Sequence, residues 1–278
     1  MRTFPAILVL LCLCVPMAAW SQVNDELITQ ASHNDTERAE QADPLNSPVW
    51  HYLRARFLGE SPYLFDDRVV VSVPPFAEDP TQVPLLVDVS AIDEPLLRLV
   101  VWADLNPIQH IYSVESADRH LPRIAIRFKV QQATPVRAAV LTESGKWLVG
   151  GQYLEAAGGG CTAPSMANAS PYWESHLGEI ESRSFERAMN SGRSSQRYKV
   201  KIIHPMDTGL VSGIPEFYIQ QLEVRRPDQA AILSMELSQP VSENPVFTFD
   251  MSSASVTAQD RYKLWMRDNN GNVFEQAL

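Results

Sequence analysis

The sequence predicts an all-β protein, with two immunoglobulin-like β-sandwich domains joined by a Gly/Cys-containing connector. Apolar residues alternate with polar ones in many short segments, and turn signals separate these segments. The 20 prolines are scattered along the chain, which is unfavourable to long helices. A length of 278 residues fits two domains of ~100–150 residues each. Together these features exclude a coiled coil or a helical bundle.

The charge balance is acidic. The chain has 33 Asp and Glu against 23 Lys and Arg, which gives a formal net charge of −10 at pH 7. Such a surface is repelled by a phosphate backbone, so the composition argues against nucleic-acid binding. The hydrophobic fraction of 45% is that of an ordinary globular protein rather than a disordered chain.

The N-terminus reads as a secretory signal peptide over residues 1–21. Arg2 supplies the positive charge, residues 6–15 form an apolar stretch too short to span a bilayer, and Ala19-Trp20-Ser21 provides a small-x-small cleavage site. The alternative is an uncleaved anchor. Residues 22–46 are polar and are expected to form a disordered or loosely held leader. After cleavage we expect no contact with a membrane.

The first predicted sandwich spans residues 47–157. Ser47-Pro48 is typical of a helix start, and the apolar spacing that follows predicts a short helix to about Gly59. The segments with strand-like alternation come next: 69–73, 83–89, 97–102, 108–114, 123–130, 136–142 and 146–154. In the segment 123–130, the pattern places Ile124, Ile126 and Phe128 in the core, and Arg123, Arg127 and Lys129 in water.

The second predicted sandwich spans residues 197–278. Its strand-like segments begin at Arg197, Phe217, Ala231, Phe247 and Tyr262. The alternation changes phase near Gln220-Gln221, which predicts a β-bulge. Asn269-Asn270-Gly271 then predicts a tight hairpin turn.

Residues 158–196 are expected to be a Gly-Cys arm and linker. Gly158, Gly159 and Gly160 precede Cys161, and glycine permits a flexible backbone that passes close to other surfaces. Two of the three cysteines leave with the signal peptide, so the exported chain keeps one thiol, that of Cys161. With no obvious neighbouring base, this thiol should have an ordinary pKa of about 8.5. It is better suited to activation in a partner's site than to catalysis alone. The alternative is a glycine hinge with an incidental cysteine.

The histidines give weak signals. His204-Pro205-Met206 could contribute two copper ligands, but no further ligands cluster with them, so no metal site is predicted. A thiol hydrolase would require His204 or His176 beside Cys161, which sequence alone does not test. No cofactor motif is found.

Several segments in both halves carry a family resemblance. They are Trp50, residues 74–89, Asn106-Pro107, residues 158–161, His204-Pro205-Met206-Asp207-Thr208-Gly209, Ile214-Pro215, Phe217-Tyr218-Ile219, Asn244-Pro245, Phe247, Phe249, Trp265 and Asp268-Asn269-Asn270-Gly271. The first half with its cysteine arm resembles SoxY, and the second half resembles SoxZ, of the bacterial periplasmic sulfur-oxidation system. The fused form is similar to SoxYZ-like carriers associated with quinoprotein dehydrogenases. One departure is that Thr162-Ala163-Pro164 and a linker follow the cysteine, where the family arm ends at a free C-terminus.

The resemblance implies a periplasmic, non-enzymatic thiol carrier. Cys161 would be the attachment point for a sulfur-containing intermediate, and Gly158, Gly159 and Gly160 would give the arm reach and clearance. The partners would be periplasmic oxidoreductases, with a quinoprotein dehydrogenase or a c-type cytochrome as candidates. The alternative function is an accessory or structural module of a quinoprotein dehydrogenase, in which Cys161 is idle.

Overall fold

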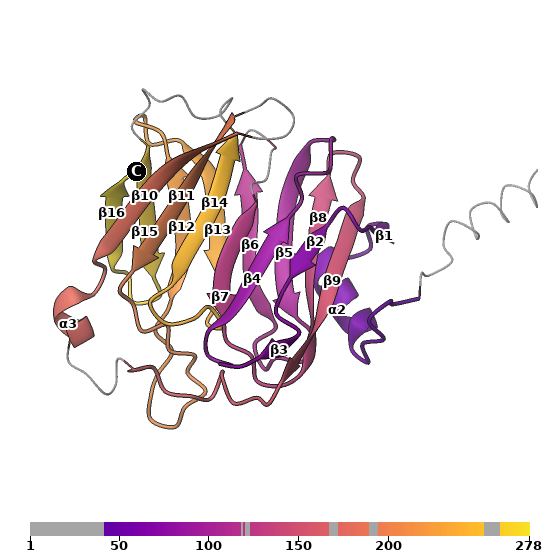
Figure 1. The fold of residues 1–278 in the computed structure, drawn as a ribbon, viewed down its shortest axis with the longest axis horizontal. Helices are drawn as coiled ribbons and strands as arrows, with labels where there is room; N and C mark the ends of the chain where they lie inside the picture. The colour runs from indigo at the N-terminus through magenta and orange to yellow at the C-terminus, as the bar shows by residue number, and fades with distance from the viewer. Residues whose placement is uncertain (1–41, 118, 120–122, 167–171, 189–193, 253–261) are drawn as a thin grey trace, which may run out of the picture. The chain divides into compact units, whose positions relative to one another are not determined.

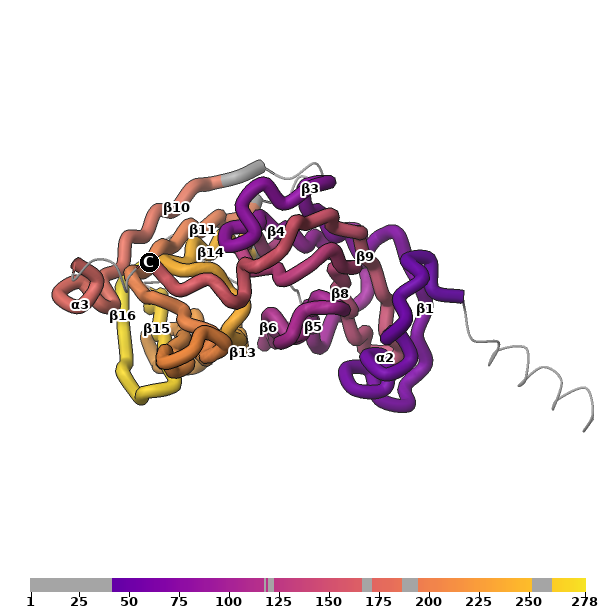
Figure 2. Tube along the Cα trace, turned by 90° about the horizontal axis from the view of Figure 1, so that it is seen from below, coloured from indigo at the N-terminus to yellow at the C-terminus, as the bar shows by residue number. Residues whose placement is uncertain are grey.

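The computed structural model is a β-sandwich of two sheets (Figure 1). Among the described residues, one sheet has ten strands in the order β1-β9-β8-β5-β6-β13-β12-β15-β16, with β3 paired to the end of β9. The other has six strands in the order β10-β11-β14-β7-β4-β2. Figure 2 shows the two layers from below, with β10, β11, β14 and β4 in one and β15, β13, β6 and β5 in the other. The predicted all-β sandwich class is confirmed.

The structure describes residues 42–117, 119, 123–166, 172–188, 194–252 and 262–278. The predicted signal peptide and the leader up to residue 41 lie outside them. Residues 43–278 form one compact unit. Within the described residues, no helix is long and apolar enough to cross a bilayer.

The elements of the first half begin with the short helix α2 (Trp50–Leu58), which ends at Gly59 as predicted. Its strands are β1 (Tyr63–Phe65), β2 (Val70–Ser72), β3 (Phe76–Ala77), β4 (Val83–Asp88), β5 (Leu96–Ala103), β6 (His110–Ser116), β7 (Ile124–Phe128), β8 (Thr134–Thr142) and β9 (Trp147–Ala156).

The second half follows the one-turn helix α3 (Tyr172–His176). Its strands are β10 (Ile180–Ala188), β11 (Ser194–Ile202), β12 (Ile219–Arg225), β13 (Ala231–Leu237), β14 (Val246–Ser252), β15 (Lys263–Asp268) and β16 (Val273–Ala277). The pairing of β12 with β15 shifts register between Ile219 and Gln221, where the bulge was predicted. The predicted hairpin turn joins β15 to β16, with Gly271 at φ +89°.

Both sheets continue from one half of the chain into the other. Strand β6 pairs with β13, from Ser116↔Leu233 to Tyr112↔Leu237, and β7 pairs with β14 through Ala125↔Thr248 and Ile124↔Phe249. One apolar core fills the space between the sheets along both halves. The two predicted sandwiches thus share their sheets, and the boundaries given for them above remain predictions.

The predicted linker 158–196 contains structure that the sequence pattern did not reveal. Strand β10 lies within it and pairs with β11 over nine residues, from Ile180↔Ile202 to Ala188↔Ser194. Its sequence alternates charged and small polar residues around Ile180 and Phe185, as expected of a largely exposed edge strand. Without knowledge of its partner strand β11, a sequence of this kind looks like a polar linker.

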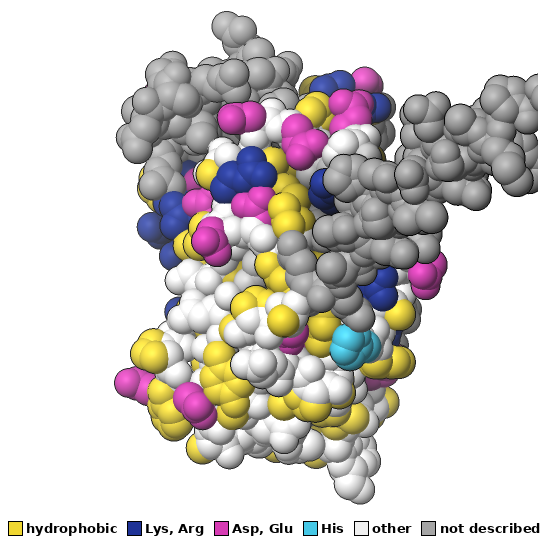
Figure 3. Space-filling model, turned by 90° about the vertical axis from the view of Figure 1, so that its right-hand side faces the viewer, with side chains coloured by type: hydrophobic (Ala, Val, Ile, Leu, Met, Phe, Trp, Pro, Cys, Tyr) yellow, Lys and Arg dark blue, Asp and Glu magenta, His cyan; other side chains and the backbone are white. Residues whose placement is uncertain are grey.

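A second apolar cluster lies on the outer face of the ten-stranded sheet, beneath α2. Trp50 and Leu53 of the helix pack with Trp102, Trp147 and neighbouring residues. Figure 3 views the side of the molecule that bears α2 and β1, where apolar and charged side chains are interspersed.

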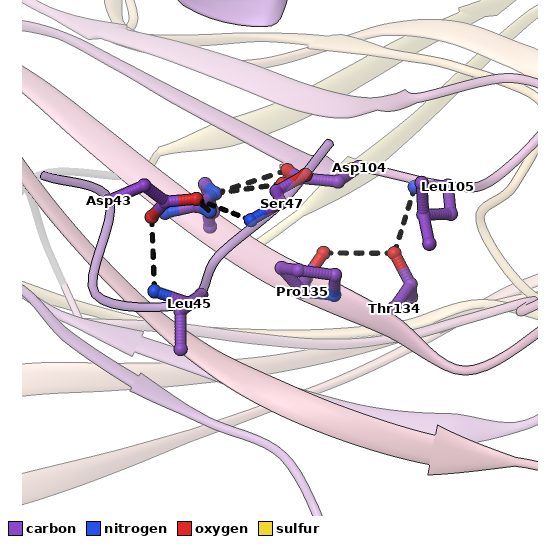
Figure 4. A network of polar contacts seen from close by, with 8 residues as sticks. Asp43, Leu45, Ser47, Asp104, Leu105, Thr134 and Pro135 are labelled. Atoms are coloured by element: carbon purple, nitrogen blue, oxygen red, sulfur yellow. Dashed lines mark hydrogen bonds and ion pairs between the residues drawn. The ribbon is translucent and has the colours of Figure 1, made fainter. Parts of the chain in front are cut away.

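A buried ion-pair network attaches the chain before α2 to this cluster (Figure 4). Arg137 on β8 donates to Asp104 at 3.0 Å and 3.2 Å, and to Asp43 at 2.7 Å. Its guanidinium also lies 4.6 Å from the ring centroid of Trp50. Asp43 in turn accepts from the backbone N–H groups of Leu45 and Ser47. The last residues of the predicted loose leader, from Asp43 onward, are therefore held in place.

Candidate functional site

The arm that carries Cys161 leaves the end of β9 and lies along the segment that follows β7. The N–H of Gly159 donates to Gln131 O at 3.2 Å, and the N–H of Gly160 donates to Val130 O at 3.0 Å. On the other side, Val130 N donates to Pro80 O at 2.8 Å. The arm is therefore docked against the first half through backbone hydrogen bonds.

Two of the three arm glycines are required by this close approach. A Cβ on Gly160 would lie 2.0 Å from Pro80 O, and one on Gly158 would lie 2.4 Å from Gln131 O. Gly158 also has φ +99°, a conformation that disfavours other residues. Gly159 has φ +90°, with open space around its Cβ position. In the docked state, Gly158 and Gly160 supply clearance.

Cys161 is buried at the end of the arm, with 1% of its surface exposed. Its Sγ donates to Lys129 O at 3.5 Å, and its own backbone oxygen accepts from Thr208 Oγ1 at 2.7 Å. Burial raises the pKa of the thiol to about 12, and the charge of Lys129 opposes this rise. The sequence-based expectation of an ordinary pKa was wrong for the docked thiol because it assumed a solvated sulfur.

Lys129 is the residue of this site that the sequence reasoning misplaced. The alternation of β7 predicts that Lys129 faces water, as Arg127 does, but Lys129 is only 3% exposed. The strand ends at Phe128, and residues 128–130 are all buried because chain segments pack on both sides of them. The Nζ of Lys129 donates a short hydrogen bond to Met206 O. The only available signal was that this lysine directly precedes the end of the predicted strand.

Charged groups surround the Lys129 ammonium. Burial lowers the pKa of Lys129, and the neighbouring carboxylates of Asp207 and Glu243 oppose this effect, as Cys161 does when it is ionised. The carboxylate of Glu243 also accepts from the backbone N–H of Met166 at 2.6 Å, beyond the cysteine. The chain is thus fixed on both sides of Cys161.

The segment 204–209 of the second half forms the other wall of the site. His204 is fully buried, and its Nδ1 accepts from Met206 N at 3.1 Å. Met206 adopts φ +51°, and its sulfur accepts from Ile219 N at 3.3 Å. These contacts hold the turn that presents Met206 O to Lys129 and the Thr208 hydroxyl to Cys161.

Neither histidine considered for catalysis is hydrogen-bonded to Cys161 among the described residues. Nε2 of His204 lies 3.6 Å from Asp268 Oδ2, and burial lowers the pKa of this imidazole. His176 lies on α3, where its ring stacks on Tyr172 at 3.8 Å and its Nδ1 contacts Tyr172 O. In the same residues, no group of three or more His, Cys, Asp and Glu side chains has an arrangement that could hold a metal ion.

Two family models match the chain, one in its first half and one in its second half. Residues 54–161 match the family model described as sulfur oxidation protein SoxY, and residues 187–278 match that of sulphur oxidation protein SoxZ. Comparison with curated protein sequences finds no significant match.

Solved structures give weaker similarities. The sulfur carrier protein SoxY from Chlorobium limicola f thiosulfatophilum is 16% identical, with coverage of 39% of this chain and 96% of that chain and a TM-score of 0.34. An exo-chitosanase, CsxA, from Amycolatopsis orientalis is 10% identical, with coverage of 75% and 26% respectively and a TM-score of 0.21.

Fold and site together define a β-sandwich protein with a single described cysteine, docked at the end of a glycine arm. The chain belongs to the SoxY and SoxZ families of sulfur-oxidation proteins, with one domain of each in a single polypeptide. The SoxY match ends at Cys161, and the SoxZ-matching half supplies Thr208, which binds that residue.

Proposed function

We propose that the protein is a periplasmic thiol carrier, which holds a sulfur-containing intermediate covalently on Cys161 and presents it to partner oxidoreductases. The observation that carries the proposal is the position of Cys161. It is the last residue of the SoxY match and the free cysteine of the described residues, and it follows three glycines. The proposal that the protein is exported to the periplasm is supported by the signal-peptide pattern of residues 1–21.

Loading is an oxidation of the thiol. A cargo thiol, R–SH, and Cys161–SH lose two protons and two electrons, and the S–S bond of Cys161–S–S–R forms. The partner oxidoreductase, for which a quinoprotein dehydrogenase or a c-type cytochrome is a candidate, accepts the electrons. Because the thiolate is the reactive form and the docked thiol is buried, the arm must leave the segment 129–131 before loading.

Intact mass spectrometry tests this function. Protein purified from its own host without a reductant should carry mass additions of sulfur or of sulfur and oxygen on Cys161, which dithiothreitol removes. Cys161→Ser should carry none. An unmodified wild-type protein from cells that are oxidising sulfur compounds would contradict the proposal. The mature N-terminus, read in the same spectrum, should be Gln22.

The second candidate is an accessory module for a periplasmic quinoprotein dehydrogenase, with Cys161 idle. The burial of the sulfur favours it, since an idle cysteine is commonly a buried apolar residue. The two candidates differ in genetic complementation. A host that carries Cys161→Ser should lose sulfur-compound oxidation if the protein is a carrier, and should keep it if the protein is an accessory module.

A further inference from the structure

Lys129 places a positive charge in the interior of the docked arm site. Its backbone oxygen accepts from the Cys161 thiol, while its Nζ reaches Met206 O, two residues before Thr208, which binds the backbone of Cys161. A buried ammonium is unfavourable unless opposite charges accompany it. The carboxylates of Asp207 and Glu243 offset part of this cost, but a methionine or leucine would fill the same space without any.

The neutral thiol adds no negative charge to those of Asp207 and Glu243, and the printed hydrogen bond of the ammonium goes to an uncharged acceptor, Met206 O. A sulfur cargo is different, because a persulfide or a thiosulfonate attached to cysteine ends in a negative charge. Such a charge would be strongly penalised in a buried site without a cation, and it would be stabilised by one. In the docked site, the Lys129 ammonium is the cation that such a charge would meet.

We propose that Lys129 is the anion-binding residue of the docked arm, where its ammonium pairs with the negative end of a sulfur cargo on Cys161. This inference rests on the proposed carrier function. It gives the docked state a role, since the loaded arm would fold back between partners and shield its S–S bond from stray thiols. Lys129 is then a specificity residue that favours anionic over neutral cargo.

The test compares an anionic and a neutral adduct on purified protein. Tetrathionate converts the Cys161 thiolate to Cys161–S–S–SO₃⁻, because the thiolate attacks the central S–S bond and thiosulfate leaves. Methyl methanethiosulfonate gives the neutral Cys161–S–S–CH₃ and releases methanesulfinate. Intact mass confirms each adduct, and the rate of its cleavage by dithiothreitol at pH 7, where that reductant is uncharged, measures how well the docked arm protects it.

Lys129→Met should accelerate cleavage of the anionic adduct about tenfold, the effect of losing one charge-assisted hydrogen bond, and that of the neutral adduct less than about twofold. Lys199→Met, at an exposed lysine of β11, should change neither rate. Equal acceleration of both adducts would overturn the proposal, because it would show that Lys129 only supports the fold. No acceleration would overturn it as well.

A second measurement covers the case in which Lys129→Met does not fold. In wild-type protein, the anionic adduct should raise the melting temperature above that of the neutral adduct, and an equal or lower melting temperature would contradict the pairing. Both adducts are made chemically. The adduct experiments therefore test the role of Lys129 separately from the carrier function. Their failure would not exclude that the native protein carries cargo, and a native protein without cargo would not change their result.

Discussion

The Thr208 hydroxyl donates a 2.7 Å hydrogen bond to the backbone oxygen of Cys161, so the SoxZ-matching half directly holds the end of the SoxY-matching half. The first half contributes the backbone oxygens of Val130 and Gln131, which accept from the arm. Docking of the arm thus depends on both halves, and its release breaks hydrogen bonds to both and exposes the buried Cys161. The reactivity of Cys161 should follow the population of the undocked arm.

The first prediction concerns Thr208→Val, which removes the donor and keeps the size of the side chain. A hydrogen bond contributes ~1 kcal/mol net, so the undocked population should rise about fivefold. The rate of Cys161 alkylation by iodoacetamide should rise by the same factor. Thr208→Ser retains the hydroxyl and should alkylate at close to the wild-type rate. An unchanged rate in the valine variant would mean that this hydrogen bond does not hold the arm.

The second prediction concerns Gly160→Ala. The new Cβ would lie 2.0 Å from Pro80 O, and backbone atoms on the facing segment have little freedom to withdraw. The arm should then stay undocked, and alkylation of Cys161 should become about tenfold faster or more, an undocking cost above ~1.4 kcal/mol.

Gly145→Ala is the matched control for backbone strain. Gly145 lies in the turn between β8 and β9 at φ +79°, with open space around its Cβ position. Its replacement should cost ~1 kcal/mol of stability without changing the alkylation rate. If Gly160→Ala behaves like Gly145→Ala, the arm does not dock as described.

The local features of the fold were predictable from the sequence because short-range patterns determine them. The bulge at Gln220-Gln221 appears as a phase change in the alternation, and the turn at Asn270-Gly271 has the residues that its dihedral angles require. The buried positions of Ile124, Ile126 and Phe128 follow from the period of a half-exposed strand.

The long-range features were not predictable. Nothing in β6 or β13 specifies the other as a neighbour, because both are ordinary amphipathic strands and their pairing is set by tertiary contacts. The buried state of Lys129 depends on Pro240 and Met206, which are distant in sequence and accept from its backbone and side chain. The sequence singles out Cys161 at the end of the glycine run but does not predict its burial, because a glycine-rich segment fits a mobile arm and a close-packed one equally well.

The third prediction is a pH dependence of stability caused by Cys161. The docked thiol has its pKa raised to about 12, whereas a thiol in the unfolded chain loses its proton at about 8.5. Between these values the folded state binds more protons than the unfolded state, so stability falls as pH rises. From pH 8.5 to 10 this group should cost about 2 kcal/mol of unfolding free energy.

Cys161→Ala lacks this group and isolates its effect, since all other titrating residues are common to both proteins. Urea unfolding at both pH values should show wild-type stability falling by about 2 kcal/mol more than that of the variant. Parallel pH profiles would show that the thiol is solvated, and hence that the arm is undocked, in solution.

The fourth prediction concerns the buried Arg137, whose guanidinium pairs with Asp104 and Asp43. Arg137→Met would leave the fully buried Asp104 without its counter-charge, and burial already raises the pKa of that carboxyl. Removing one partner of a buried pair costs about 3–5 kcal/mol, so urea unfolding should show a loss of that size. Arg68→Met, which breaks the exposed pair with Asp66, is the matched control and should cost less than ~1 kcal/mol. Similar losses in the two variants would mean that water reaches Asp104, and that the chain before α2 is not fixed to β8 by this pair.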